Sequence, residues 1–336
     1  MANRSKDLSS EDRLTTWIRR QLLTQNYHRV GDDAAILPAG PSWAVSTDHQ
    51  ISNIHFPIGL DPALIAHRLL LVNLSDLAAM GAKPTFAFLT LSCPSAFDVK
   101  RFFRSLISRC GDFEVELAGG DLARAEVVSA ALTVLGKRPE GGSWLRRSNA
   151  RAGDRLWLGG SLGRSALGRE LIRQGAELRG RSILLPKGLS IPPGCLAEAR
   201  RAVKAHLTPY PQLTLGHWIG QQTRGAAIDI SDGLALDLYR LCRESSVGAE
   251  IFEDQLPLSK TFTKLAEHLN LSPLNLVLGG GEDYSLLFAL SPQLILPRHL
   301  GCVEIGSTKT GSMIHLHSSK GRNRLAVSGW DHFTEA

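Results

Sequence analysis

One segment of this 336-residue chain constrains its fold most, because it interrupts an otherwise regular alternation of helical and strand-like stretches. Residues 136–154 are rich in Gly, Arg and Ser and have no clear hydrophobic period, and a strand-like run follows them at once. A single hydrophobic core rarely grows much beyond about 250 to 300 residues. We therefore predict two domains of mixed α/β structure, at residues 1–140 and 150–336.

The first half alternates between helical and strand-like patterns. A capping pattern at residues 9–12 precedes an amphipathic stretch that ends near Gln25. Asp61 and Pro62 provide an N-cap and a first-turn proline for a helix over 63–80, which Gly81 ends. We also expect a helix at 98–109 and strands at 34–37, 43–47, 85–91, 113–118 and 127–135.

The second half repeats this style. Helical patterns cover residues 164–174, 196–206, 212–221 and 234–244. Strand-like runs cover residues 155–159, 226–230, 285–290, 303–305 and 313–316. The fold class that both halves predict is therefore α/β, or α+β with mixed sheets.

Composition and charge exclude several classes of protein. An apolar fraction of 43% with 21% charged residues is typical of an ordered globular protein. The net charge of +6 is spread along the chain, so we expect no nucleic-acid partner. The most apolar stretch, 64–80, contains His67, Arg68, Asn73 and Asp76, so we expect no membrane partner and a cytoplasmic location. Five scattered cysteines are expected to be reduced: Cys93, Cys110, Cys195, Cys242 and Cys302.

Aspartates recur where apolar runs begin, end or are interrupted. Singly, each could be a turn residue, a helix cap or a solvated side chain. Together they predict a magnesium site, because clustered carboxylates repel one another unless they share cations, and Mg²⁺ prefers oxygen ligands. The recurring positions are Asp32 and Asp33 before 34–37, Asp48 and Asp121 at expected strand ends, Asp76 within a helix, and Asp229 and Asp232 around Ser231.

Glycines add a weaker signal for phosphate binding. The pair Gly119-Gly120 would let backbone N–H groups approach anionic oxygens, although most such pairs are turns. The sequence contains no G-x-x-x-x-G-K-[ST] loop, no G-x-G-x-x-G fingerprint and no H-R-D catalytic loop. An ATP site in this chain would therefore not be of a common type.

Eight segments in order resemble the motif series of thiamine-monophosphate kinases. They are GDDAAIL (31–37), STDHQISNIHFP (46–57), NLSDLAAMGAKP (73–84), AGGD (118–121), RSNARAGD (147–154), AIDISDGL (227–234), GGGEDY (279–284) and GWDHF (329–333). The resemblance implies the two-domain fold of aminoimidazole ribonucleotide synthetase. Its N-terminal domain would pair in a homodimer, and its C-terminal domain would complete the site for ATP and thiamine phosphate.

The resemblance also implies roles for residues. Several magnesium ions would bind Asp33, Ser46, Thr47, Asp48, Asp76, Asp121, Asp229 and Asp232. ATP, as co-substrate, would contact Gly120, Asp121, Arg147 and Ser231, with Arg147 as a charge stabiliser and no residue acting as acid or base. Thiamine monophosphate would contact His55, Glu282 and Trp330, although these could also be a packed histidine, a solvated loop acid and a core aromatic residue. Assistance by a monovalent cation stays open.

The expected reaction is direct in-line transfer of the γ-phosphate of ATP to thiamine monophosphate, giving thiamine diphosphate. Three positions depart from the family pattern, namely Leu122, Gln212 and Ser285. Two alternatives remain open at this point: a sister ATP-dependent enzyme of the same superfamily, and a non-catalytic ATP-binding sensor. No cysteine lies in an N-terminal Gly-rich loop, which argues against a selenophosphate synthetase.

Overall fold

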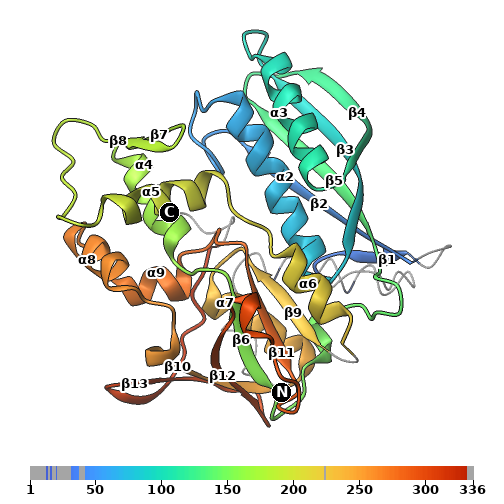
Figure 1. Cartoon of the computed structure of the whole chain (residues 1–336), viewed down its shortest axis with the longest axis vertical. Helices are drawn as coiled ribbons and strands as arrows, with labels where there is room; N and C mark the ends of the chain where they lie inside the picture. The colour runs from blue at the N-terminus through green and yellow to red at the C-terminus, as the bar shows by residue number, and fades with distance from the viewer. Residues whose placement is uncertain are drawn as a thin grey trace.

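The computed structural model describes residues 13, 16, 20, 32–37, 42–222 and 225–330, which form two mixed β-sheets with their helices (Figure 1). The helix that we predicted to end near Gln25 lies almost wholly outside the described residues. Gly31 and the last part of the terminal motif, 331–333, also lie outside them. The predicted mixed α/β fold is confirmed.

The N-terminal sheet has five strands in the order β1-β2-β5-β3-β4. Only β3 and β4 pair in parallel, and the helix α3 connects them; the other pairs are antiparallel. Helices α2 and α3 pack on one face of this sheet (Figure 1). The elements are β1 (Ala35–Leu37), β2 (Trp43–Ile51), α2 (Pro62–Ala79), β3 (Lys83–Cys93), α3 (Val99–Asp112), β4 (Glu116–Arg124) and β5 (Ser129–Lys137).

Helix α2 is the central element of the molecule. The Asp61 side chain accepts a hydrogen bond from the N–H of Ala63 at 2.9 Å, and Pro62 occupies the first turn, as the sequence predicts. Among the described residues it is the single helix long and apolar enough to cross a membrane, but 72% of it is buried inside the protein. It contacts both sheets, so its apolar character is that of a core helix.

The C-terminal sheet has seven strands in the order β14-β13-β10-β12-β6-β11-β9. Only β10 and β13 pair in parallel. Its strands are β6 (Arg155–Gly159), β9 (Ala226–Ile230), β10 (Gly248–Phe252), β11 (Ser285–Leu290), β12 (Val303–Lys309), β13 (Ile314–Ser318) and β14 (Gly321–Arg324). Its helices are α4 (Arg164–Arg173), α5 (Leu196–Leu207), α6 (Leu213–Gly220), α7 (Leu234–Ser245), α8 (Lys260–His268) and α9 (Pro273–Gly279). A small hairpin, β7 (Glu177–Arg179) and β8 (Ser182–Leu184), and the 3₁₀ helices η1 (Arg147–Asn149), η2 (Glu253–Gln255) and η3 (Arg298–Leu300) complete it.

Two strand ends differ from the prediction. Asp48 and Asp121 were expected to end strands, but both lie inside strands that continue to Ile51 and Arg124. Strand β2 continues because β5 pairs with it along its whole length, and β4 continues because β3 pairs with it as far as Arg124. Partner strands, rather than the local apolar runs, set these ends.

A separate apolar cluster joins the two sheets. It includes Ala79 from α2, Leu215 and Ile219 from α6, and Phe288 from β11. Helix α6 approaches α2 closely at Gly216, where an added Cβ atom would lie 2.0 Å from the backbone oxygen of Ala78. Only glycine permits this contact, which holds the end of α2 against the C-terminal half.

Candidate active site

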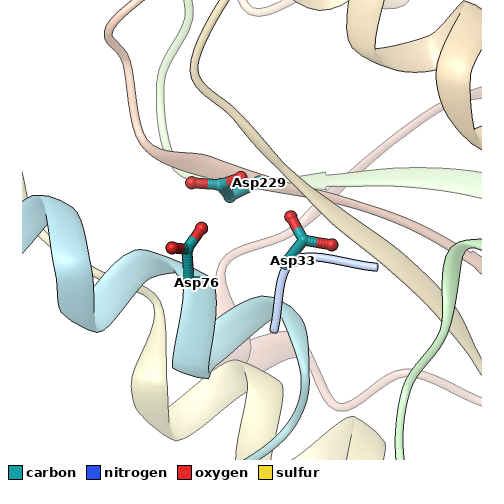
Figure 2. Close-up of side chains that lie close together, drawn as sticks. All are labelled: Asp33, Asp76 and Asp229. Atoms are coloured by element: carbon teal, nitrogen blue, oxygen red, sulfur yellow. The ribbon is translucent and has the colours of Figure 1, made fainter. Parts of the chain in front are cut away.

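Three carboxylates converge where the two halves meet. Asp33 precedes β1, Asp76 lies in the last turn of α2, and Asp229 lies in β9. One oxygen of each lies within 4.8 Å of the others, and the side chains point toward one another (Figure 2). We call these three residues the acidic cluster. Because it draws residues from both halves of the chain, it exists only when the two halves are docked.

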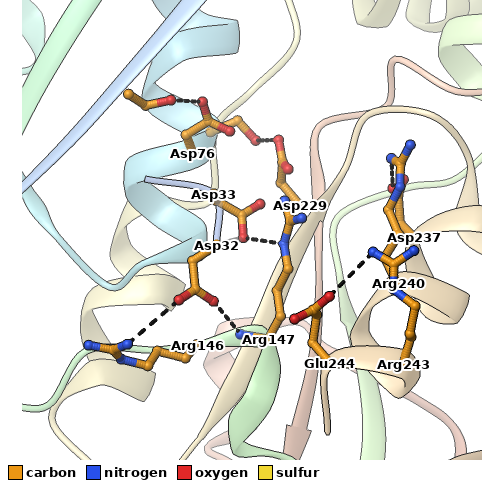
Figure 3. A network of polar contacts seen from close by, with 12 residues as sticks. Asp32, Asp33, Asp76, Arg146, Arg147, Asp229, Asp237, Arg240, Arg243 and Glu244 are labelled. Atoms are coloured by element: carbon orange, nitrogen blue, oxygen red, sulfur yellow. Dashed lines mark hydrogen bonds and ion pairs between the residues drawn. The ribbon is translucent and has the colours of Figure 1, made fainter. Parts of the chain in front are cut away.

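Neighbouring hydroxyl and amide groups hold the acidic cluster. Ser46 in β2 donates a hydrogen bond to Asp76, and the Ser75 hydroxyl donates to Asp229 at 2.8 Å (Figure 3). The backbone N–H of Asp48 donates to the Asn73 side chain at 2.9 Å. The alternation of β2 places Ser46 and Asp48 on the face that α2 covers.

The electrostatics of the acidic cluster favour a bound cation. Burial raises the pKa of Asp76 well above its ordinary value, and the nearby charges of Asp48 and Asp33 raise it further. Burial likewise raises the pKa of Asp229, together with the charges of Asp76 and Asp33. Among the described residues, Asp33 Oδ1 is a buried oxygen without a hydrogen-bond partner. A hard divalent cation would satisfy this oxygen and offset the repulsion.

Arg147 borders the acidic cluster. Its Nε atom donates to Asp33 Oδ2 at 2.9 Å, and its backbone N–H donates to Asp32 at 2.9 Å (Figure 3). Arg146 lies 3.8 Å from the second oxygen of Asp32. Burial is the largest single influence on the pKa of Arg147 and tends to lower it, but the charge and hydrogen bond of Asp33 and the charge of Asp229 together raise it. The guanidinium therefore keeps its charge and a fixed position.

The turn from Ser231 to Gly233 follows β9, the strand that carries Asp229 of the acidic cluster. The buried carboxylate of Asp237 accepts from the N–H groups of Asp232 at 3.0 Å and Gly233 at 3.2 Å. Arg240 donates to both Asp232 and Asp237. Burial raises the pKa of Asp237 to about 7. The pair Asp237 and Arg240 thus holds the turn in place from α7.

Glu282 lies among basic groups at the other end of the site. The fully buried Arg68 donates to Glu282 and also to Gln50 at 3.1 Å. Arg169 lies 3.7 Å and His206 Nδ1 3.4 Å from the second carboxylate oxygen. Burial would raise the pKa of Glu282, but nearby positive charge, above all that of Arg68 and then that of Arg169, lowers it. Burial lowers the pKa of His206 to about 3, so this imidazole is neutral at neutral pH. We call Glu282 and these three residues the Glu282 cluster.

Further contacts link the Glu282 cluster to the predicted substrate residues. The guanidinium of Arg169 lies 5.7 Å from the centre of the Trp330 ring. The charge of His55 acts on the pKa of Glu282, and the backbone N–H of Trp330 donates to Asp232 at 2.9 Å. The structure thus brings Glu282, Trp330 and His55 into one region beside the turn at Ser231.

Other predicted residues lie apart from the acidic cluster. Alternation places Thr47 on the uncovered face of the N-terminal sheet, where its hydroxyl lies 2.8 Å from that of Thr133. Gly120 and Asp121 are exposed on the edge strand β4, and a Cβ atom at Gly120 would lie 2.0 Å from the backbone oxygen of Leu89. Metal binding by Thr47, Asp121 and Asp232 and ATP binding by Gly120 stay predictions.

Several residues of the site were not predicted. Ser75 directly precedes Asp76, and a lone arginine, Arg68, interrupts an apolar helix; the second is a sequence signal for a buried ion pair. Asp237 and Arg240 lie three residues apart on a helix that follows the predicted turn, which is also a readable signal. His206 carries no signal of this kind.

Comparison with known proteins agrees with this geometry. Residues 31–137 match the family model described as AIR synthase related protein, N-terminal domain. The thiamine-monophosphate kinase of Buchnera aphidicola subsp. Schizaphis graminum is 33% identical over 319 residues, which are 90% of this chain and 92% of the relative. That of Escherichia coli K12 is 34% identical over 272 residues, 79% of this chain and 76% of the relative. This chain belongs to the thiamine-monophosphate kinase family.

Solved structures agree with the family. The structure of AaThiL complexed with AMPPCP and TMP superposes with a TM-score of 0.83 at 27% identity and covers 99% of this chain and 100% of that one. The HypE–HypF complex has a TM-score of 0.69 at 18% identity and covers 93% and 98%, which shows a shared fold. The predicted resemblance is therefore confirmed.

Proposed function

We propose that this chain is a kinase that transfers the γ-phosphate of ATP directly to the phosphate of thiamine monophosphate, giving thiamine diphosphate and ADP. The observation that carries the proposal is the convergence of Asp33, Asp76 and Asp229 within 4.8 Å at the junction of the two halves. The chain is similar to members of this kinase family over most of its length.

The acidic cluster fits magnesium. Its donors are carboxylate oxygens, and Asp33 Oδ1 is buried and lacks a hydrogen-bond partner among the described residues. Asp33, Asp76 and Asp229 would hold the metal, with Ser46 and Asp48 beside them. Bound magnesium offsets the negative charge of the phosphate groups. Several ions, and assistance by a monovalent cation, belong to the proposal.

The protein residues orient the reactants rather than move protons. A phosphate monoester is largely dianionic at neutral pH, so the acceptor oxygen needs no general base. Arg147, whose position is fixed by Asp32 and Asp33, would place a positive charge beside the transferred phosphoryl group. Ser231, at the turn that Asp237 holds, would contact ATP, together with Gly120 and Asp121.

The Glu282 cluster and Trp330 would bind the organic part of the substrate. Thiamine carries a cationic thiazolium ring, which suits an aromatic face and a carboxylate. Trp330 is 43% exposed, and Glu282 is half-buried, so both present surface to a ligand. His55 would line the same pocket.

A homodimer is part of the proposal. The face of the N-terminal sheet opposite α2 carries the exposed side chains of Thr47, His49, Phe88 and Thr90, and Phe88 is 43% exposed. No described element covers this face. We infer that residues 1–140 bind metal and ATP and pair with a second copy there, that residues 150–336 complete both sites, and that the protein acts in the cytoplasm.

A coupled ADP-release assay with thiamine monophosphate tests the proposal. Magnesium-dependent turnover, with thiamine diphosphate identified by chromatography, is expected for the wild type and should collapse in Asp48→Asn. The matched control is Asp112→Asn, an exposed carboxylate in a surface pair with Arg109. ATP binding without turnover would instead indicate a nucleotide sensor, and turnover with another acceptor only would indicate a sister enzyme.

A further inference from the structure

Tyr284 has an unusual backbone and an unused hydroxyl. Its φ of +49° lies in the left-handed region, which is uncommon for an aromatic residue. Its backbone N–H donates to Ile230 at 2.9 Å, directly beside Asp229. The side chain is 7% exposed, yet among the described residues its hydroxyl makes no hydrogen bond. A strained, buried residue with an unpaired donor calls for an explanation.

Tyr284 links the two charged regions of the site, because it lies two residues after Glu282 and its backbone N–H donates to Ile230, the neighbour of Asp229. The charges of Arg68, Glu282, Asp48 and Asp229 all act on the pKa of its hydroxyl. A tyrosine phenol is neutral at neutral pH and can donate a hydrogen bond. The hydroxyl is also not one of the fully enclosed polar atoms that lack a partner, so it retains contact with solvent.

The ligand group that fits this position is a phosphate. The acidic cluster would hold the metal and the nucleotide phosphates, and Glu282 with Trp330 would hold the cationic ring. The phosphate is the end of thiamine monophosphate that must face the nucleotide, so it would lie between these two regions. An arginine here would pair with the surrounding carboxylates, as Arg147 and Arg68 do, whereas a neutral phenol stays available.

We propose that the Tyr284 hydroxyl donates a hydrogen bond to the phosphate of the acceptor substrate and so holds the attacking oxygen in place. The inference rests on the proposed function. It adds a substrate-contacting residue to the site, and it predicts that the contact recognises the phosphate and not the ring.

The variant Tyr284→Phe tests this inference, because it removes the hydroxyl alone. We expect kcat/KM for thiamine monophosphate to fall about 10- to 100-fold, the effect of losing one hydrogen bond to a charged group. The Kd for thiamine monophosphate should rise, while the Kd for thiamine, which lacks the phosphate, should not change. The melting temperature should not fall, because the hydroxyl has no partner to lose within the protein. The control is Tyr239→Phe, whose ring lies beside Arg243 on α7.

The outcomes separate the two proposals. Thiamine diphosphate formation by the wild type establishes the proposed function independently of the variant. An active wild type with an equally active Tyr284→Phe protein overturns the inference alone. Equally weakened binding of thiamine and thiamine monophosphate also overturns the inference, because the hydroxyl would then contact the ring. A lower melting temperature overturns it too, because the hydroxyl would then stabilise the fold. A wild type that does not turn over thiamine monophosphate overturns both.

Discussion

The two ends of the site treat buried charge in opposite ways. In the Glu282 cluster, the protein supplies the counter-charges itself, so the pKa of Glu282 is lowered despite burial. In the acidic cluster, like charges add to burial, so the pKa values of Asp76 and Asp229 are raised. At one end the protein supplies the positive charge, and the other end is left for a cation. Neutralising a carboxylate should therefore stabilise the protein at one end and destabilise it at the other.

The largest effect is expected for Asp76→Asn, with opposite signs for activity and stability. Loss of this ligand should lower kcat about 10³-fold. In the absence of magnesium the variant should melt at a higher temperature than the wild type, because a buried repulsive charge is gone. ADP release and calorimetry in EDTA measure the two effects.

The stability gain of Asp76→Asn should depend on pH in one direction. The pKa of Asp76 in the folded protein lies above its unfolded value of 3.8. Between these two pKa values the folded state binds more protons than the unfolded state, so this group costs more stability as pH rises. The gain should vanish below about pH 4. A metal-free variant less stable than the wild type at neutral pH would show that the Asp76 charge is not repelled in the folded protein.

Glu282→Gln should destabilise the protein. Arg68 is fully buried, and removal of its counter-charge should cost about 3 kcal/mol of the free energy of unfolding. Urea denaturation measures it. In the control, Glu304→Gln, an exposed pair with Arg155 is lost and the change should stay under about 1 kcal/mol. Equal losses of stability in both variants would argue against charge pairing within the Glu282 cluster.

Gly216→Ala tests whether the acidic cluster depends on the docking of the two halves. The new methyl group would meet the backbone of Ala78, two residues beyond Asp76, and should cost about 2 kcal/mol and lower kcat. The control is Gly111→Ala in α3, where nothing lies within 4 Å of the new Cβ atom. That change should be neutral or stabilise by up to about 1 kcal/mol. Full activity in Gly216→Ala would show that the acidic cluster does not depend on the close contact between α6 and α2.

Arg169→Gln should have the smallest effect on stability, because Arg169 is the exposed arginine of the Glu282 cluster. The Arg169 side chain is 44% exposed and lies 3.7 Å from Glu282, so its loss should change stability by under about 1 kcal/mol. Arg68→Gln, at the fully buried position, is the contrasting variant and should cost several times more. Similar losses of stability in both variants would show that burial of the arginine does not determine its contribution in the Glu282 cluster.

Local patterns predicted many elements well. The strands β6, β9 and β11 have the bounds that the apolar runs indicate. Strand β10 was missed because it is short and carries Glu250, and α8 was missed although Ser259 caps it, accepting from the N–H of Phe262 at 3.2 Å. Such a cap is readable from sequence, whereas the pairing of β10 with β12 and β13 depends on distant residues.

The set of carboxylates, the glycine-containing turns and the order of motifs that marks the family can all be read from the sequence, because these are local properties of the chain. Which carboxylates meet depends on the tertiary fold. Asp48 and Thr47 are adjacent in sequence, but the strand alternation of β2 sends them to opposite faces of the sheet. Asp229 reaches Asp76 because α6 and β11 dock the second half on α2. Counter-charges such as Arg68 for Glu282 are likewise set by contacts between segments 214 residues apart, which no local pattern specifies.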